Sequence, residues 1–213
     1  MAARDDGTSR SESDRHADDQ ASPFPLVPGA WVLDQAHSMV SFSIRHLGVS
    51  KVRGRFRTFD AELVVGASPR ATSVTAVVEL ASIDTANAQR DEHVRSAEIL
   101  DVAQRPQISF RSTAIDGSGS RWHVDGELTI GAITRPLRLE VEFGGVETFV
   151  IDGTRHAGFE ATGELRRKDF GIAPGGAGAL LGDVVKVELD LQFIEPDRGR
   201  SSRSMGQGRY ASG

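Results

Sequence analysis

The chain of 213 residues contains no cysteine. Disulfide bonds, thiolate catalysis and cysteine-ligated zinc or iron–sulfur centres are therefore excluded. An excess of basic charge is also missing, because 25 Lys and Arg stand against 30 Asp and Glu and give a formal net charge of −5. A nucleic-acid-binding protein normally has a basic body, so we expect no nucleic acid among the partners.

Long hydrophobic runs are absent as well. No stretch approaches the length of about 18 consecutive apolar residues that marks a membrane-spanning helix, so we expect no transmembrane segment. Residues 1–20 contain no apolar stretch of the kind that a secretory signal peptide requires. This absence predicts a cytoplasmic location.

Hydrophobic residues make up only 38% of the chain, and the deficit lies at its two ends. Residues 1–22 contain no Val, Leu, Ile, Phe, Trp or Tyr, and residues 196–213 contain few apolar residues. We therefore expect a disordered acidic tail over 1–28, one folded domain over 29–195, and a disordered basic tail over 196–213.

Between the tails, apolar and polar residues alternate in many short segments. In the clearest one, Val185, Val187 and Leu189 share one face while Lys186 and Glu188 share the other. A period of two predicts a half-buried strand. Comparable segments occur at 40–44, 52–59, 61–66, 73–80, 107–114, 122–130, 137–143 and 156–168. Eight or nine antiparallel strands with short connections fit either a two-sheet sandwich or a closed barrel, so the fold class is all-β.

One segment breaks this alternation. Residues 86–100 contain no Gly or Pro and are mostly good helix formers, which predicts one short helix between strands. Thr85 or Asn87 could cap its start, and Asp91 and Arg95 have the spacing of a supporting ion pair.

Five phenylalanines fall on the apolar faces of the predicted strands. They are Phe42, Phe56, Phe110, Phe143 and Phe193. The interior, and any cavity within it, should therefore be apolar.

The histidines do not form a convincing catalytic or metal-binding pattern. His37 and His46 are nine residues apart, which fits neither the helical nor the strand spacing of common metal pairs. We predict no metal, no cofactor and no catalytic residue. A metal-dependent barrel enzyme that uses His37, His46, Asp91 and His93 is kept as an alternative. The glycine-rich segment 174–182 lacks the G-K-[ST] ending of a phosphate loop and is interpreted as a connection between strands.

From Trp31 to Ile194 the chain resembles the YceI-like family, also described as polyisoprenoid-binding and lipocalin-like. The resemblance rests on an ordered set of short motifs with matching spacing. They are Asp34, His37-Ser38, Phe42, His46, Gly54, Phe56, Arg90-Asp91-Glu92-His93, Asp101, Pro106, Phe110, Gly126-Glu127-Leu128-Thr129-Ile130, Gly131, Thr134-Arg135-Pro136, Arg167-Lys168-Asp169-Phe170-Gly171 and Gly182-Asp183.

The resemblance implies an eight-stranded antiparallel barrel with a short helix near one end. It also implies an apolar channel that binds or carries an isoprenoid or quinone-like lipid, without enzyme activity. The five phenylalanines would then line the channel. His46, Asp91 and His93 would either line a polar entrance or hold the helix in place, and Arg167 could pair with Asp169.

Two further readings stay open. The barrel could be filled by its own side chains and act as a stress-response or interaction protein whose tails contact a partner. An exposed edge strand would also allow a homodimer.

Overall fold

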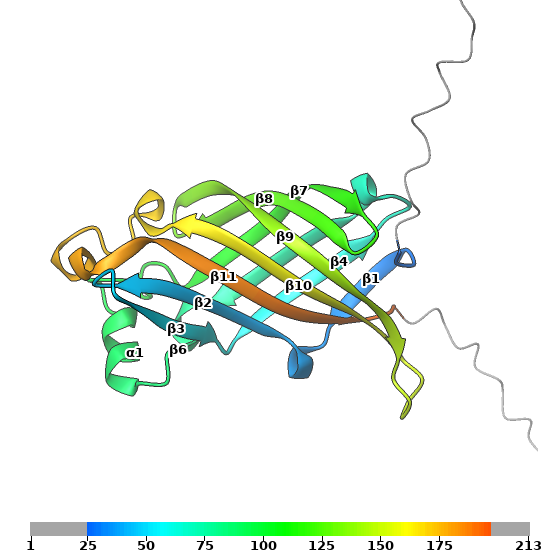
Figure 1. Ribbon diagram of the computed structural model, residues 1–213, viewed down its shortest axis with the longest axis horizontal. Helices are drawn as coiled ribbons and strands as arrows, with labels where there is room; N and C mark the ends of the chain where they lie inside the picture. Colours follow the sequence, from blue (N-terminus) through cyan, green and yellow to red (C-terminus); the bar gives the residue numbers. More distant parts are fainter. Residues whose placement is uncertain (1–24, 197–213) are drawn as a thin grey trace, which may run out of the picture.

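The computed structural model describes residues 25–196, which form an elongated β-barrel with a helix at one end (Figure 1). The strands are β1 (Gly29–Leu33), β2 (Met39–His46), β3 (Ser50–Phe56), β4 (Phe59–Val65), β5 (Ser73–Glu79), β6 (Ile83–Asp84), β7 (Gln107–Ser118), β8 (Arg121–Ile130), β9 (Ile133–Thr148), β10 (Arg155–Arg166) and β11 (Leu181–Ile194). The helices are α1 (Ala88–Arg95) and the short 3-10 turns η2 (Gln35–His37), η3 (Pro69–Ala71), η4 (Leu80–Ser82), η5 (Arg167–Phe170) and η6 (Gly176–Leu180). The tail segments 1–24 and 197–213 lie outside these residues, so their predicted disorder stays a prediction.

Alternating side chains produce the inner and outer faces of the strands. In β8, Trp122, Val124 and Leu128 are buried, whereas their neighbours His123 and Glu127 are exposed. Successive side chains of a strand point to opposite faces, so the apolar set faces the interior.

Within residues 25–196, eight strands form a closed antiparallel ring in the order β1-β4-β5-β7-β8-β9-β10-β11. The ring closes where Val32 and Leu33 of β1 pair with Ile194 and Phe193 of β11. The predicted barrel is therefore confirmed, and the sandwich is excluded.

Strand β11 has two partners on the same side. Its C-terminal end pairs with β1, whereas residues 185–190 pair with β2. Strand β2 pairs with β3, and β3 pairs with β6 only at Arg55 and Phe56. Among the described strands, residues 50–54 of β3 therefore keep an unpaired edge.

The predicted helix is present but shorter than residues 86–100. The Asn87 side chain accepts a hydrogen bond from the Arg90 main chain and caps the start, and the helix ends at Arg95. After Ser96 the chain turns, because Ile99 and Leu100 are buried at the end of the barrel. The expected pairing of Asp91 with Arg95 is wrong: Arg95 donates to the carbonyls of Ala81 and Ile83 instead.

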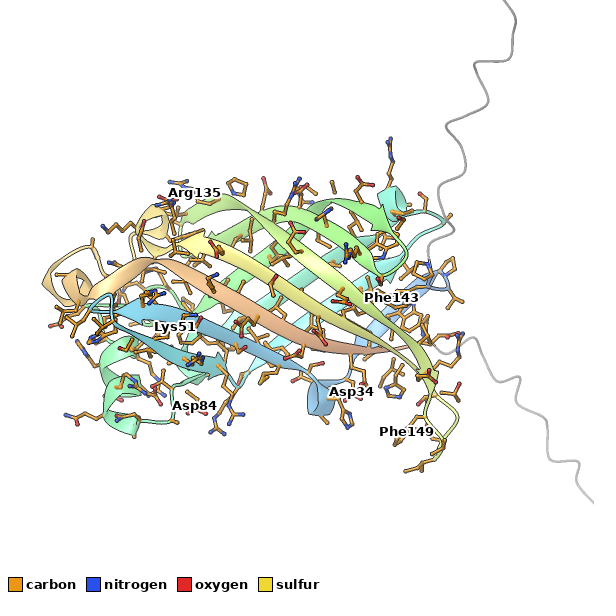
Figure 2. The ribbon with its side chains drawn as sticks, in the orientation of Figure 1. Asp34, Lys51, Asp84, Arg135, Phe143 and Phe149 are labelled. Carbon is orange, nitrogen blue, oxygen red and sulfur yellow. The ribbon has the colours of Figure 1, made fainter. Side chains whose placement is uncertain are left out.

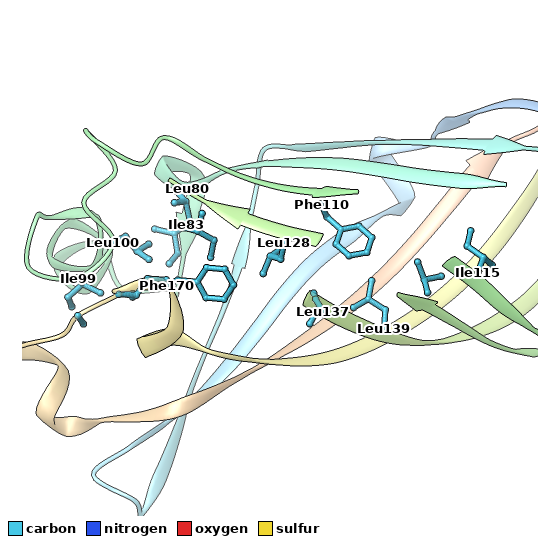
Figure 3. Close-up of a cluster of buried hydrophobic side chains, with 14 of the residues drawn as sticks. Leu80, Ile83, Ile99, Leu100, Phe110, Ile115, Leu128, Leu137, Leu139 and Phe170 are labelled. Atoms are coloured by element: carbon cyan, nitrogen blue, oxygen red, sulfur yellow. The ribbon is translucent and has the colours of Figure 1, made fainter. Parts of the chain in front are cut away.

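The end of the barrel that carries α1 is closed by packed apolar side chains. Leu80, Ile99, Leu100 and Phe170 are buried there, at one end of a cluster that continues along the interior through Phe110 (Figure 3). We call these four residues and their buried neighbours Ile83, Ile172 and Ala173 the apolar plug.

A buried arginine organises the loop over the plug. Arg167 is only 2% exposed, and its guanidinium donates to the carbonyls of Ile172 and Ala173, and of Gly178, Leu181 and Gly182. The expected ion pair with Asp169 is therefore replaced by main-chain acceptors. The glycine-rich segment does connect β10 to β11, and it contains η6.

Residues 25–28 pack against the end of the barrel opposite α1. Leu26 is buried, and the Trp31 indole donates to the Val27 carbonyl at 3.0 Å. Residues 25–28, which we expected in the tail, thus contact the barrel. Among the helices within residues 25–196, none combines the length and apolar character needed to cross a membrane.

Candidate functional site

The barrel encloses a cavity of about 190 Å³ between the apolar plug and Leu26. Residues of β4, β5 and β7 form one part of its wall, and residues of β8 to β11 form another. Strands β2 and β3 and the segment before β1 complete the lining. The alternation of each strand explains this wall, because every second side chain points to the barrel axis.

Aromatic rings form much of the lining. Phe56, Phe110, Phe143 and Phe193 face the cavity, as the strand pattern predicts. Phe42 lies outside the lining: its ring contacts Phe56, with ring centres 5.5 Å apart, and covers Gly54. It therefore packs beside the cavity, against Phe56 and the interior cluster.

Sequence reasoning missed Phe159, which also lines the cavity. Its ring centre lies 5.3 Å from that of Phe143 and 6.0 Å from that of Phe193. The signal was available, because Phe159 alternates with the small residues Ala157 and Ala161 in a strand predicted over 156–168.

The lining has almost no polar surface. The residues of the lining that carry polar side chains are Ser41, Asp60 and Thr72. The Ser41 hydroxyl donates to the Glu188 carbonyl at 2.9 Å, and the Thr72 hydroxyl donates to the Ser68 carbonyl at 2.9 Å. Among the described residues, every buried side-chain nitrogen or oxygen has a hydrogen-bond partner. The wall therefore offers few polar atoms to a ligand within the cavity.

A cavity of this kind suits an apolar guest. Apolar cavities on the order of 150 Å³ stay dry and take up apolar molecules, because water finds no hydrogen-bond partners in them. Binding then follows from removing the guest's apolar surface from water.

The three polar residues predicted near an entrance lie apart from this lining. Asp91 is buried and accepts a hydrogen bond from the Thr85 main chain at 2.9 Å and another from the Thr85 hydroxyl. His93 is exposed and contacts Glu98 at 3.1 Å, and His46 is half-buried beside Leu181. In the structure Asp91 fixes α1 to the preceding segment, which is the second of the two roles expected for it.

The alternative metal site is not assembled. His37 lies in η2, before β2, and contacts Asp34 at 2.9 Å. His46 ends β2, so the two histidines are separated by the length of an eight-residue strand, about 25 Å. Within residues 25–196, no three His, Asp or Glu side chains gather as a metal-binding group.

A cluster of polar side chains lies outside the cavity, beside the β9–β10 hairpin. Asp34 accepts from Gln192, whose amide also contacts His156 at 2.7 Å. Burial raises the pKa of Asp34, but hydrogen bonds from His37 and Ala36 outweigh it and hold that pKa below its ordinary value. These contacts join the turn after β1 to β10 and β11 and explain the polar motif at Asp34 and His37 as structural.

Comparison with known proteins gives one consistent family. The model of the YceI-like domain matches residues 31–193. Protein YceI of Salmonella arizonae is 40% identical over 137 residues, which are 64% of this chain and 71% of that protein.

Solved structures share the fold. The YCEI protein of Campylobacter jejuni superposes with a TM-score of 0.64 at 28% identity, covering 78% of this chain and 97% of that one. A polyisoprenoid binding domain from Saccharophagus degradans superposes with a TM-score of 0.60, covering 78% of this chain and 98% of that one. Its identity is 14%, so this second likeness concerns the fold alone.

Proposed function

Because the chain belongs to the YceI-like domain family, we propose that it binds the apolar chain of an isoprenoid or quinone-like lipid inside its barrel. The observation that carries the proposal is the cavity of about 190 Å³ with its carbon-lined wall. Each methylene group of a guest that enters it contributes about 0.8 kcal/mol through burial. The description of the Saccharophagus degradans relative as a polyisoprenoid binding domain supports the same ligand class.

The head group of such a lipid would stay outside the cavity. The hydroxyls of Ser41 and Thr72 already donate to main-chain carbonyls, so the wall offers little to a polar group. A polar head group buried there would lose its hydrogen bonds to water without replacement. The proposed specificity is therefore for the length and shape of the apolar chain.

We propose binding without a chemical step. A catalytic site needs a nucleophile or base within hydrogen-bonding reach of the substrate. Of the lining residues with polar side chains, Ser41 and Thr72 donate to main-chain carbonyls, and Asp60 accepts from the Ala61 main chain at 2.9 Å. These groups are thus engaged in hydrogen bonds within the barrel wall. The presence of a cavity argues against a fully filled barrel. The cytoplasmic location and the homodimer stay predictions, to be checked by cell fractionation and by size-exclusion chromatography.

The first experiment is native mass spectrometry of freshly purified protein, followed by organic extraction of the bound material. We expect one prenyl lipid or quinone per chain. Bare protein that also binds no member of a panel of isoprenoids would contradict the proposal.

A cavity-filling variant locates the binding site. Ala76 and Ala161 both line the cavity, so Ala76→Leu/Ala161→Leu adds apolar volume where the guest would lie. We expect bound lipid to fall at least tenfold, while the melting temperature is kept or raised because filling a void stabilises a core. The matched control, Ala114→Leu on an exposed position of β7, should retain the lipid. Equal lipid content in both variants would place binding outside the barrel.

A further inference from the structure

The β2–β3 turn exposes apolar side chains at the end of the molecule. Leu47 is 59% exposed and Val49 is 83% exposed. Leu180, from the loop before β11, is 51% exposed and lies beside them, because its carbonyl accepts a hydrogen bond from the Leu47 main chain at 2.8 Å. We call Leu47, Val49 and Leu180 the apolar tip.

The backbone of Leu47 has a conformation that is unfavourable for leucine. Leu47 has φ of 54° and Gly48 has φ of 73°, and the Val49 main chain donates to the His46 carbonyl across the turn. A turn whose two central residues both have positive φ favours Asn-Gly, and a leucine in the left-handed region is disfavoured. Strain of this kind at an exposed apolar residue points to a role outside the fold.

Cations surround the apolar tip. Arg45, Lys51 and Arg53 are exposed on the two strands that lead to and from the turn, and Figure 2 shows Lys51 there. Arg45 and Lys51 are direct cross-strand partners, an arrangement in which like charges repel. The nearby acid Asp183 is engaged by Arg166 at 3.1 Å. We call Arg45, Lys51 and Arg53 the basic collar, and it lies on a chain whose net charge is −5.

A second exposed apolar tip lacks such a collar. Phe149, Val150 and Ile151 protrude on the β9–β10 hairpin at the opposite end (Figures 1 and 2). The charged side chains beside them are Glu147, Asp152 and Arg155, and Arg155 is paired with Glu195 at 2.8 Å. Apolar exposure alone therefore does not distinguish the two ends, whereas the sign of the neighbouring charge does.

We propose that the β2–β3 turn docks the protein on an anionic lipid bilayer. The apolar tip would enter the boundary between headgroups and acyl chains, and the basic collar would contact the anionic headgroups. Apolar insertion combined with flanking Lys and Arg is the pattern of peripheral membrane binding. This proposal goes beyond lipid carriage, because it requires no ligand in the cavity.

The test measures co-sedimentation of the full chain with vesicles of phosphatidylglycerol and of phosphatidylcholine. We expect binding to phosphatidylglycerol vesicles that weakens with added salt, and much weaker binding to phosphatidylcholine vesicles. Lys51→Gln/Arg53→Gln should bind about 25-fold more weakly, because each cation near an anionic surface contributes about fivefold.

The apolar tip is tested with Leu47→Asn/Val49→Thr. This variant should bind phosphatidylglycerol vesicles at least tenfold more weakly, because it removes the inserted apolar surface. Its melting temperature should stay equal or rise, since Asn tolerates a positive φ and Thr keeps the branched shape of Val. A loss of vesicle binding together with kept stability separates docking from a folding defect.

Two matched controls make comparable changes at the opposite end. Val150→Thr/Ile151→Asn alters the other apolar tip, and Arg70→Gln/Arg121→Gln removes two exposed cations. Both should bind vesicles as the unaltered chain does. The proposal is overturned if the β2–β3 variants keep full binding or if the control variants lose it instead. It is also overturned if the protein binds phosphatidylglycerol and phosphatidylcholine vesicles equally well. Protein stripped of lipid should dock equally well, so docking by a chain that never retains a lipid would refute only the proposed carriage.

Discussion

The carboxylate of Asp84, labelled in Figure 2, joins the end of β3 to the segment that follows β6. It accepts hydrogen bonds from the Arg55 and Arg57 guanidinium groups, each at 3.1 Å, and from the Ala86 main chain at 2.9 Å. The Ala86 hydrogen bond, with those from the two arginines, holds the pKa of Asp84 below its ordinary value of 3.8.

We expect Asp84→Asn to lower the free energy of unfolding near neutral pH and to matter less in acid. A carboxyl whose pKa is depressed by folding contributes stability above its unfolded pKa, and that contribution is lost as pH falls through the folded pKa. Urea unfolding of both proteins between about pH 7 and pH 2 measures the difference. It should shrink below pH 3.8.

A variant without the two cationic partners serves as the control for this prediction. In Arg55→Met/Arg57→Met, the Asp84 carboxyl loses both guanidinium groups, so replacing Asp84 there should produce a smaller pH-dependent difference. A difference that is constant from neutral to acid pH would contradict the assignment.

At the scale of elements, the segment 25–28 and the apolar plug close the two ends of the cavity differently. Leu26 is buried and lines the cavity, whereas Leu80 in the plug is buried away from it. The first closure consists of a short segment that precedes β1, and the second is built from three segments, 80–83, 99–100 and 170–173. A guest should therefore leave more readily past Leu26.

We expect Leu26→Ala and Leu80→Ala each to cost about 2–5 kcal/mol of stability, as buried leucines do. Only Leu26→Ala should also speed the release of a bound lipid. Stopped-flow transfer of a fluorescent isoprenoid analogue to acceptor vesicles measures this rate in both variants. Faster release from the Leu80 variant alone would place the exit at the other end.

The elements differ in how far the sequence predicts them. Long strands such as β8 and β11 follow from alternation, because each buries one face along its whole length. Strands β1 and β6 were not predicted, since β1 has five residues and β6 has two, and their partners lie far away in the chain. The end of α1 depends on the burial of Ile99 and Leu100, which is a tertiary contact.

Some features of the candidate site also follow from the sequence, whereas others depend on the folded structure. The inward direction of Phe110, Phe143 and Phe193 follows from a period of two. The empty volume between them does not, because it depends on how side chains from opposite walls fill the space. The carbonyl partners of Arg167 come from a folded loop, so the residue pattern suggested Asp169 as the partner instead.

At the scale of the whole molecule, a guest bound in the cavity should raise the free energy of unfolding of the barrel. Two apolar clusters meet around it, one centred on the plug and one around Trp31 and Phe193. A guest that binds only the folded barrel contacts both clusters and so stabilises the whole chain. Its effect follows from mass action and does not require a change of shape.

Protein loaded with lipid should therefore melt at a higher temperature than lipid-free protein. A free ligand at about 100 times its Kd adds about 2.7 kcal/mol, which corresponds to roughly 5–10 °C for a domain of this size. Calorimetry on extracted and reloaded protein measures the shift. Identical melting curves, with lipid retained throughout, would mean that the guest binds the unfolded chain equally well.

The pairing of β1 with β11, which closes the barrel, is expected to form late in folding. Val32 pairs with Ile194, so the contact that closes the wall joins residues from the two ends of the described chain. Contacts of such large sequence separation form late, because loop closure must precede them, and a ribosome delivers β11 last. Until then the future cavity is an open, curled sheet with apolar residues in water. The proposed guest, which would lie inside the closed ring, is therefore expected to load after β1 and β11 have paired.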